Sequence, residues 1–254
     1  MQTVYLNAPI VRRVVLEGPA LRIQSRQQAD RYLPLARINR IVSRGVIHWH
    51  TAALMRCFQM GIPVTFLDRE GRLVGIGFGA WPHDGKLSEL LDQFFTLPEG
   101  PQRLIQWFRS QSRARLLRLL RRQRLEISDL RIRQAREQLH ESWREKFPGT
   151  GEAPVRAMKS LATAQISRVL ADYRINPALL EPGHDWHGLL RYLAGILEWE
   201  LWDLALSGKV TPASSDYRDV VTVYQSHEPA LEQKIRHIIR RLWRWLEHSG
   251  AYLP

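Results

Sequence analysis

The sequence is poor in cysteine and has no long apolar run. Its 254 residues include one cysteine, Cys57, which excludes an intrachain disulfide and a zinc site built on several cysteines. No apolar run reaches the roughly 18 residues that a membrane-spanning helix needs. The N-terminus lacks the basic start and long apolar run of a secretory signal. We therefore expect a cytoplasmic protein that does not contact a membrane.

Acidic residues are also scarce relative to basic ones. The chain has 37 basic and 25 acidic residues, so its net charge is +12. Only five of the basic residues are lysine, which leaves 32 arginines. Arginine presents a planar fork of donors that binds phosphate in a bidentate manner. This composition indicates a polyanionic partner, most simply nucleic acid. The alternative is that the arginines merely solvate helix surfaces.

The first eighty residues predict short strands. Apolar or alternating runs are separated by turn residues, and the runs 62–67 and 72–76 predict a hairpin. One short helix is expected from Thr51 to Met60, with Thr51 as its cap and Gly61 ending it.

From about residue 87, apolar residues recur every three or four positions, which is typical of helices. Beyond the apolar repeats at 87–95 and 104–120, we expect helices over 129–146, 154–173, 187–206 and 228–248. The predicted fold class is α+β, with a small β-rich domain followed by a larger all-α domain. We place the β-rich domain at 1–80, a linker at 81–95 and the helical domain at 96–254.

Arginines gather in two of the predicted helical segments. Because phosphate contacts dominate nucleic-acid affinity, we identify as candidate DNA-binding residues Arg113, Arg115, Arg118, Arg121, Arg122, Arg236, Arg240, Arg241 and Arg244. The alternative is two solvated helix faces. No zinc finger or other base-reading pattern is present, so backbone contacts are favoured over sequence readout.

Other patterns give weaker indications of a site. The glycines of 75–79 alternate, lack a following lysine and predict a strand end rather than a phosphate loop. His48 and His50 would share one face of a strand, but no acid or cysteine nearby completes a metal site. The loop residues Glu181, His184, Asp185 and His187 could hold a divalent cation, or Asp185 could cap the helix that follows.

One stretch of the chain resembles a known family. Tyr32–Val42, Gly45–Ile47, Thr51–Leu54 and Gly61–Gly71 together resemble the N-terminal domain of the CRISPR-associated integrases of spacer acquisition, the Cas1 family. The similarity is weaker in the helical half, where the segments 158–179 and 242–254 resemble a long helix and the closing helix and tail of that family.

The resemblance implies a homodimer formed through the β domains, with helical lobes that bind prespacer and repeat DNA. It also implies a Cas2 partner and a role in antiviral defence. Family members act as integrases and endonucleases and join spacer 3′-hydroxyls to the repeat by transesterification. They use Mg²⁺ or Mn²⁺ held by one Glu, one His and one Asp. On this resemblance, His184 is the candidate catalytic and metal-binding histidine.

The other two metal ligands are not evident in this chain. Arg131 or Arg133 falls where the family has its glutamate, and 189–192 contains no carboxylate where it has its aspartate. A guanidinium has no lone pair to donate to a metal. We therefore expect an incomplete metal site, and a DNA-binding structural subunit that works beside an active paralogue.

Two other hypotheses stay open. One is a working integrase whose acids lie elsewhere, with candidates Glu137, Glu141, Glu181, Glu198 and Glu200. The other is a non-catalytic, arginine-rich module that binds the backbone of RNA or DNA. Such a module would bind single and double strands equally well.

Overall fold

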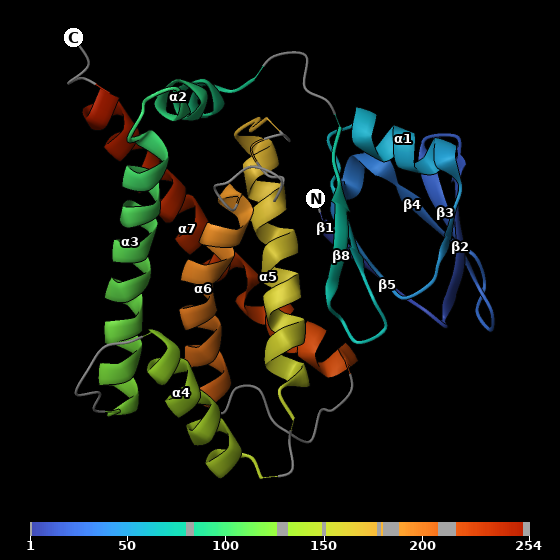
Figure 1. Ribbon diagram of the computed structural model, residues 1–254. Helices are drawn as coiled ribbons and strands as arrows, with labels where there is room; N and C mark the ends of the chain where they lie inside the picture. The colour runs from blue at the N-terminus through green and yellow to red at the C-terminus, as the bar shows by residue number, and fades with distance from the viewer. Residues whose placement is uncertain are drawn as a thin grey trace. The chain divides into compact units, whose positions relative to one another are not determined.

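The chain forms strands first and helices afterwards. The computed structural model describes residues 2–79, 84–125, 132–148, 151–176, 179, 188–207 and 217–250. Figure 1 shows the strand-rich beginning and the helical remainder, which confirm the predicted α+β class. The chain divides into two compact units. The first comprises Met1–Ser88 and Thr163–Ala178, and the second comprises Glu89–Ala162 and Leu179–Pro254. The boundary at residue 80 and the linker at 81–95 stay predictions.

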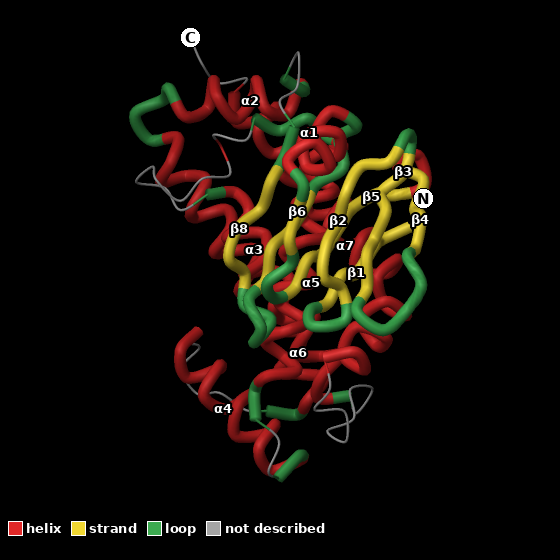
Figure 2. Tube along the Cα trace, turned by 90° about the vertical axis from the view of Figure 1, so that its right-hand side faces the viewer, coloured by secondary structure: helices red, strands yellow, loops and turns green. Residues whose placement is uncertain are grey.

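The first unit contains two four-stranded sheets (Figure 2). One has the order β1-β5-β7-β8, formed by Gln2–Asn7, Ile38–Arg44, Val64–Leu67 and Leu73–Gly77. The other has the order β4-β3-β2-β6, formed by Arg31–Pro34, Ala20–Ser25, Val11–Glu17 and His48–Trp49. A short 3-10 helix, η1 (Leu35–Arg37), precedes β5. The predicted hairpin is the antiparallel pair β7–β8, whereas β5 pairs in parallel with both β1 and β7.

The core of the first unit combines both sheets with one helix. Leu21 and Ile23, two positions apart on β3, turn the same face inward and pack in one cluster with Ile41 of β5 and Cys57 of α1 (Thr51–Gln59). Removing these side chains from water is the main force that holds the sheets together. Burial also raises the pKa of the Cys57 thiol to about 12, so the thiol stays protonated.

Helix α1 forms where it was expected, but its predicted cap is wrong. His50 is the N-cap residue and makes no side-chain capping bond, while Thr51 is already helical. His50 is placed there because β6 ends at Trp49. His48 lies in β6 and His50 follows it in extended backbone, and both line one hollow of the first unit. The shared face of their imidazoles stays a prediction.

Two of the alternating glycines, Gly77 and Gly79, lie close to Phe58 of α1 at the end of β8. A Cβ at Gly77 would lie 2.3 Å from the Phe58 ring, and one at Gly79 would lie 2.1 Å from the Phe58 carbonyl oxygen. Only glycine allows this approach. The expected strand end is confirmed, since β8 ends at Gly77.

The described ranges contain six further helices. They are α2 (Lys86–Phe95), α3 (Gly100–Gln123), α4 (Ile132–Lys146), α5 (Ala153–Asp172), α6 (Leu189–Leu206) and α7 (Tyr217–Gly250). The last residues of α4, α5 and α6 agree with the predicted last residues to within about one position. None of the helices in the described ranges is long and apolar enough to cross a membrane.

The predicted start of the last helix, at 228, is wrong because α7 begins eleven residues earlier and runs through Pro229. Proline removes one backbone donor and usually ends a helix. Here Val220 and Tyr224 are buried before the proline, and Leu231 and Ile235 are buried after it. Packing on both sides of Pro229 outweighs the lost hydrogen bond.

Candidate nucleic-acid interface

Helix α3 carries one stripe that changes from apolar to cationic along its length. Leu104, Phe108, Arg115 and Arg122 follow one another at spacings of four and seven residues, so they share a face of the helix. Leu104 and Phe108 are buried in the first half, where Phe108 stacks on Tyr192 of α6 with ring centroids 4.9 Å apart. The arginines occupy the second half of the same stripe.

Aromatic packing joins α3 to α7 at the apolar end. The Trp107 and Trp245 rings lie 5.9 Å apart, and Phe94 of α2 contacts Trp245 edge-on at 5.1 Å. Aromatic pairs at these separations add to the free energy of burial. They hold the two arginine-bearing helices together at one end.

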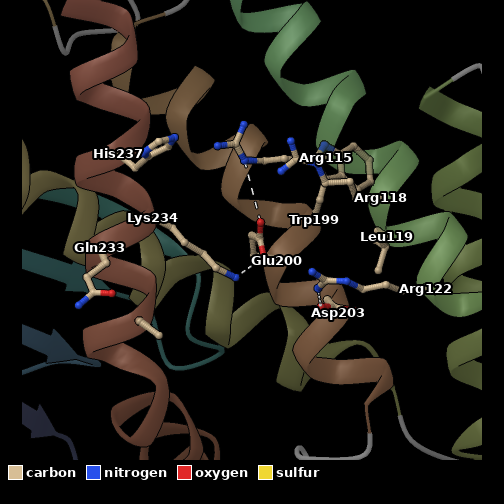
Figure 3. A pocket seen from close by; sticks show the side chains of 11 residues that line it. Arg115, Arg118, Leu119, Arg122, Trp199, Glu200, Asp203, Gln233, Lys234 and His237 are labelled. Atoms are coloured by element: carbon tan, nitrogen blue, oxygen red, sulfur yellow. Dashed lines mark hydrogen bonds and ion pairs between the residues drawn. The ribbon is translucent and has the colours of Figure 1, made fainter.

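The three helices α3, α6 and α7 line a groove of about 480 Å³. Figure 3 shows arginines from α3 and Lys234 from α7 reaching toward the acids of α6 between them. The groove is lined by Arg115, Arg118, Leu119, Arg122, Trp199, Glu200, Asp203, Ala230, Gln233, Lys234 and His237. Four of these side chains are permanent cations and two are carboxylates, so the lining has excess positive charge.

Two acids of α6 fix part of this lining. The Glu200 carboxylate accepts from Lys234 and lies 4.0 Å from Arg115 Nε. One turn later, Asp203 accepts from Arg122 Nη1 at 2.5 Å and from Gln123 Nε2 at 3.3 Å. These pairs hold the side chains of α3 and α7 against α6.

Arg115 lies in a cationic cluster that Glu200 compensates only in part. Its side chain is only 10% exposed. Burial lowers the pKa of the Arg115 guanidinium, Arg118 and Arg241 lower it further, and Glu200 opposes them. The structure gives Arg118 and Arg241 no acidic partner within its described ranges. A guanidinium stays charged in proteins, so an anion in the groove would relieve the repulsion among the three arginines.

A second charged centre lies on another face of α6. The Glu198 side chain, 11% exposed, accepts from Arg136 Nη2 of α4 at 2.9 Å and lies 3.2 Å from Lys159 Nζ of α5. Arg136 also lies over the Trp199 ring, 5.5 Å from its centroid. Two cations therefore already balance the one buried carboxylate.

The structure brings together some of the sequence-predicted DNA-binding arginines. Arg115, Arg118 and Arg122 line the groove, and Arg241 adds its charge beside Arg115. Arg236 is half-buried and pairs with Glu232 on its own helix. The others are exposed outside the groove lining, namely Arg113 and Arg121 on α3 and Arg240 and Arg244 on α7.

The candidate metal ligands fall into two groups. Glu181, His184, Asp185, His187 and Arg131 lie outside the described residues. Among the residues that are described, no group of three His, Cys, Asp or Glu side chains could hold a metal ion.

The described carboxylates do not fit a metal centre for a chemical reason. Glu198 and Glu200 each have two cationic neighbours, and Glu137 pairs with the exposed Arg133. Glu141 is exposed. A carboxylate already held by a guanidinium and an ammonium has little negative charge left for a divalent ion.

Sequence reasoning missed the part that α6 plays in the groove. Trp199 and Asp203 were not singled out, and Arg136 and Lys159 were not connected with Glu198. The sequence does carry a signal for Trp199 and Asp203, because with Glu200 they recur at helical spacing beside basic segments. The Glu198 pairs join residues far apart in the sequence and carry no local signal.

Comparison with known proteins gives two kinds of similarity. The family model for the CRISPR associated protein Cas1 matches residues 10–146, more than half of the chain. A Cas1 protein from Thermotoga maritima has a similar fold, with a TM-score of 0.72, 13% identity, and coverage of 95% of this chain and 97% of that one.

Two further solved structures have the same fold. A casposase bound to an integration product matches with a TM-score of 0.70 and 11% identity, over 95% of this chain and 90% of that one. The TtCas1–DNA complex matches with a TM-score of 0.61 and 13% identity, over 94% and 91%. No curated protein matches the sequence.

The Glu198 centre predicts a difference between two conservative substitutions. Glu198→Gln removes the negative charge that Arg136 and Lys159 both contact and should lower the free energy of unfolding by about 2 kcal/mol. Glu137→Gln removes the exposed ion pair with Arg133 on the same helix and should change the free energy of unfolding by less than about 0.5 kcal/mol. Urea unfolding followed by circular dichroism measures both, and equal effects would contradict the structural role of Glu198.

Proposed function

Because the chain belongs to the family of the CRISPR associated protein Cas1, we propose that it is a DNA-binding protein of spacer acquisition. The observation that carries this proposal is the cationic groove between α3, α6 and α7. Support comes from the casposase, which is bound to an integration product, and from TtCas1, which forms a complex with DNA.

The proposed contact is with the phosphate backbone. Arg118 lines the groove, whereas Arg241 and Arg244 lie on α7 outside its lining. All three are exposed and have no acidic partner within the described ranges, so their forks are free to bind phosphate oxygens. Arg115, Arg122 and Lys234 are held against α6 and set the shape of the groove. Such contacts position a duplex without reading its sequence.

We propose that this chain is a structural subunit of the integration machinery rather than the one that performs transesterification. The reason is the donor set, since Glu198 and Glu200 are each held by an arginine and a lysine, and no group of three possible ligands occurs among the described residues. The Mg²⁺ or Mn²⁺ that the family uses would stabilise charge on the reacting phosphate. An active paralogue in the same assembly would supply that centre.

Dimerisation through the first unit completes the proposal, together with a Cas2 partner, as expected for the family. Large exposed apolar side chains in the first unit support it, because such side chains commonly mark an interface. Leu73 and Val74 are two such side chains that are adjacent on one strand. Leu73 and Val74 belong to β8, an edge strand whose outer backbone groups are available for pairing.

The first prediction concerns DNA affinity. The triple variant Arg118→Ala/Arg241→Ala/Arg244→Ala, called here the α3–α7 variant, should bind a labelled duplex about tenfold more weakly at 150 mM salt. The slope of log K against log[salt] should become shallower by about 2.7, or about 0.9 for each lost phosphate contact. Fluorescence anisotropy over a salt series measures both quantities.

The matched control removes three exposed arginines elsewhere in the helical unit, Arg133→Ala/Arg144→Ala/Arg156→Ala. It makes the same change in net charge. If both variants lose affinity equally, the binding depends on overall charge and the groove has no special role.

The second prediction concerns chemistry. The chain alone, with Mg²⁺ or Mn²⁺, a labelled prespacer and a repeat-bearing plasmid, should give no integration product above the protein-free background. It should still retard the same DNA in a gel, which shows that the protein is folded and bound. Robust integration that disappears in His184→Ala would show that the chain is a working integrase.

The third prediction concerns assembly. Sedimentation equilibrium of the purified chain should give twice its mass of 29.6 kDa. Leu73→Glu/Val74→Glu places two charges on the β8 edge and should yield monomers. The control Met55→Glu/Met60→Glu, on and just after α1, should remain dimeric. A wild-type chain that sediments as a monomer would refute dimerisation through β8.

A further inference from the structure

The first unit has a basic depression of its own, which we call the β-unit trough. It consists of two adjoining hollows of about 1180 and 730 Å³ that share Arg12, Ser25 and His48. Arg12 lies on β2 and His48 on β6, and these strands pair side by side (Figure 2). The basic residues that line the trough are Arg12, Arg13, Arg26, Arg44, His48, His50 and Arg69.

Acidic residues are almost absent from the trough. Among the described residues that line it, Asp30 is the only acid, and it already accepts from Arg22 Nε at 2.7 Å. The larger hollow has no acidic lining residue at all. Three exposed arginines, Arg12, Arg26 and Arg69, therefore converge on a hollow whose described lining contains no carboxylate.

Neutral groups hold part of this arrangement in place. Arg44 Nη1 donates to Asn7 Oδ1 at 3.2 Å, and Arg44 Nη2 donates to the backbone oxygen of Arg69. These bonds position the Arg44 fork at the rim of the larger hollow. Arg12, Arg26 and Arg69 are exposed, and the structure gives them no acidic partner within its described ranges.

A buried hydroxyl also lines the trough. Ser25 lines both hollows, and its Oγ is buried without a hydrogen-bond partner in the described structure. A buried polar group without a partner costs free energy. Serine hydroxyls commonly donate to phosphate oxygens in nucleic-acid complexes, so a phosphate in the trough would satisfy Ser25.

The size and lining of the trough favour an extended polyanion. Small-molecule sites are typically about 300–1,000 Å³ and mostly apolar, whereas the larger hollow exceeds this range and is lined by arginines. We propose that the β-unit trough is a second, sequence-independent binding site for the phosphate backbone of nucleic acid, separate from the groove of the helical unit.

The test uses the full chain and a labelled duplex in fluorescence anisotropy. The variant Arg12→Ala/Arg26→Ala/Arg69→Ala should bind about tenfold more weakly at 150 mM salt. Its log–log salt slope should become shallower by about 2.7, as expected for three lost phosphate contacts. The control Arg31→Ala/Arg37→Ala/Arg56→Ala removes three exposed arginines of the same unit outside the trough, and should lose less than about threefold.

Several outcomes would overturn the proposal. Equal losses in the trough variant and its control would show that overall charge is responsible. An unchanged affinity in the trough variant would show that the trough serves another anion, such as an acidic protein segment. If the triple variant fails to fold, Arg26→Ala alone should still make the slope shallower by about 0.9.

The α3–α7 variant separates this proposal from the proposed function. If that variant binds like the wild type while the trough variant loses affinity, the groove assignment fails and the trough stands. The reverse result removes the trough and keeps the groove. A wild-type chain that binds no duplex at low salt refutes both.

Discussion

The charge arrangement of the helical unit depends on two carboxylates of α6. Glu198 and Glu200 are two residues apart, so they lie on different faces of the helix. Glu198 binds Arg136 and Lys159 from α4 and α5, whereas Glu200 binds Lys234 of α7 and lies near Arg115 of α3. One helix thus neutralises cations on one side and organises a groove with excess positive charge on the other.

The fold class and the family could be predicted because turn residues, hydrophobic periodicity and the family motif each lie within a short stretch of the sequence. Pro148 follows the end of α4 near the expected position, and the stretch from Tyr32 to Gly71 carries the family resemblance. The start of α7 could not be predicted, since burial of Val220 and Tyr224 decides it. The cap of α1 was also missed, because β6 ends one residue before His50.

The candidate site was predictable only as a list of arginines. The sequence showed that Arg115, Arg118 and Arg122 belong to one arginine-rich helical segment, but the residues that complete the groove come from α6 and α7. Whether an arginine binds an acid or remains available for phosphate depends on tertiary contacts. Arg122 and Arg118 illustrate this, since they are four residues apart and only Arg122 pairs with Asp203. The basic residues of the β-unit trough gave no such signal because they come from five separate segments.

The single thiol of the chain lies in the core of the first unit, fully buried and protonated near neutral pH. Maleimides react with the thiolate of an accessible cysteine, so the natural sequence offers almost no background to such reagents. A fluorophore or nitroxide attached to one introduced cysteine would therefore report from that position alone. Distances between labels in the groove, the trough and bound DNA could be measured without first removing Cys57 from the packed interior.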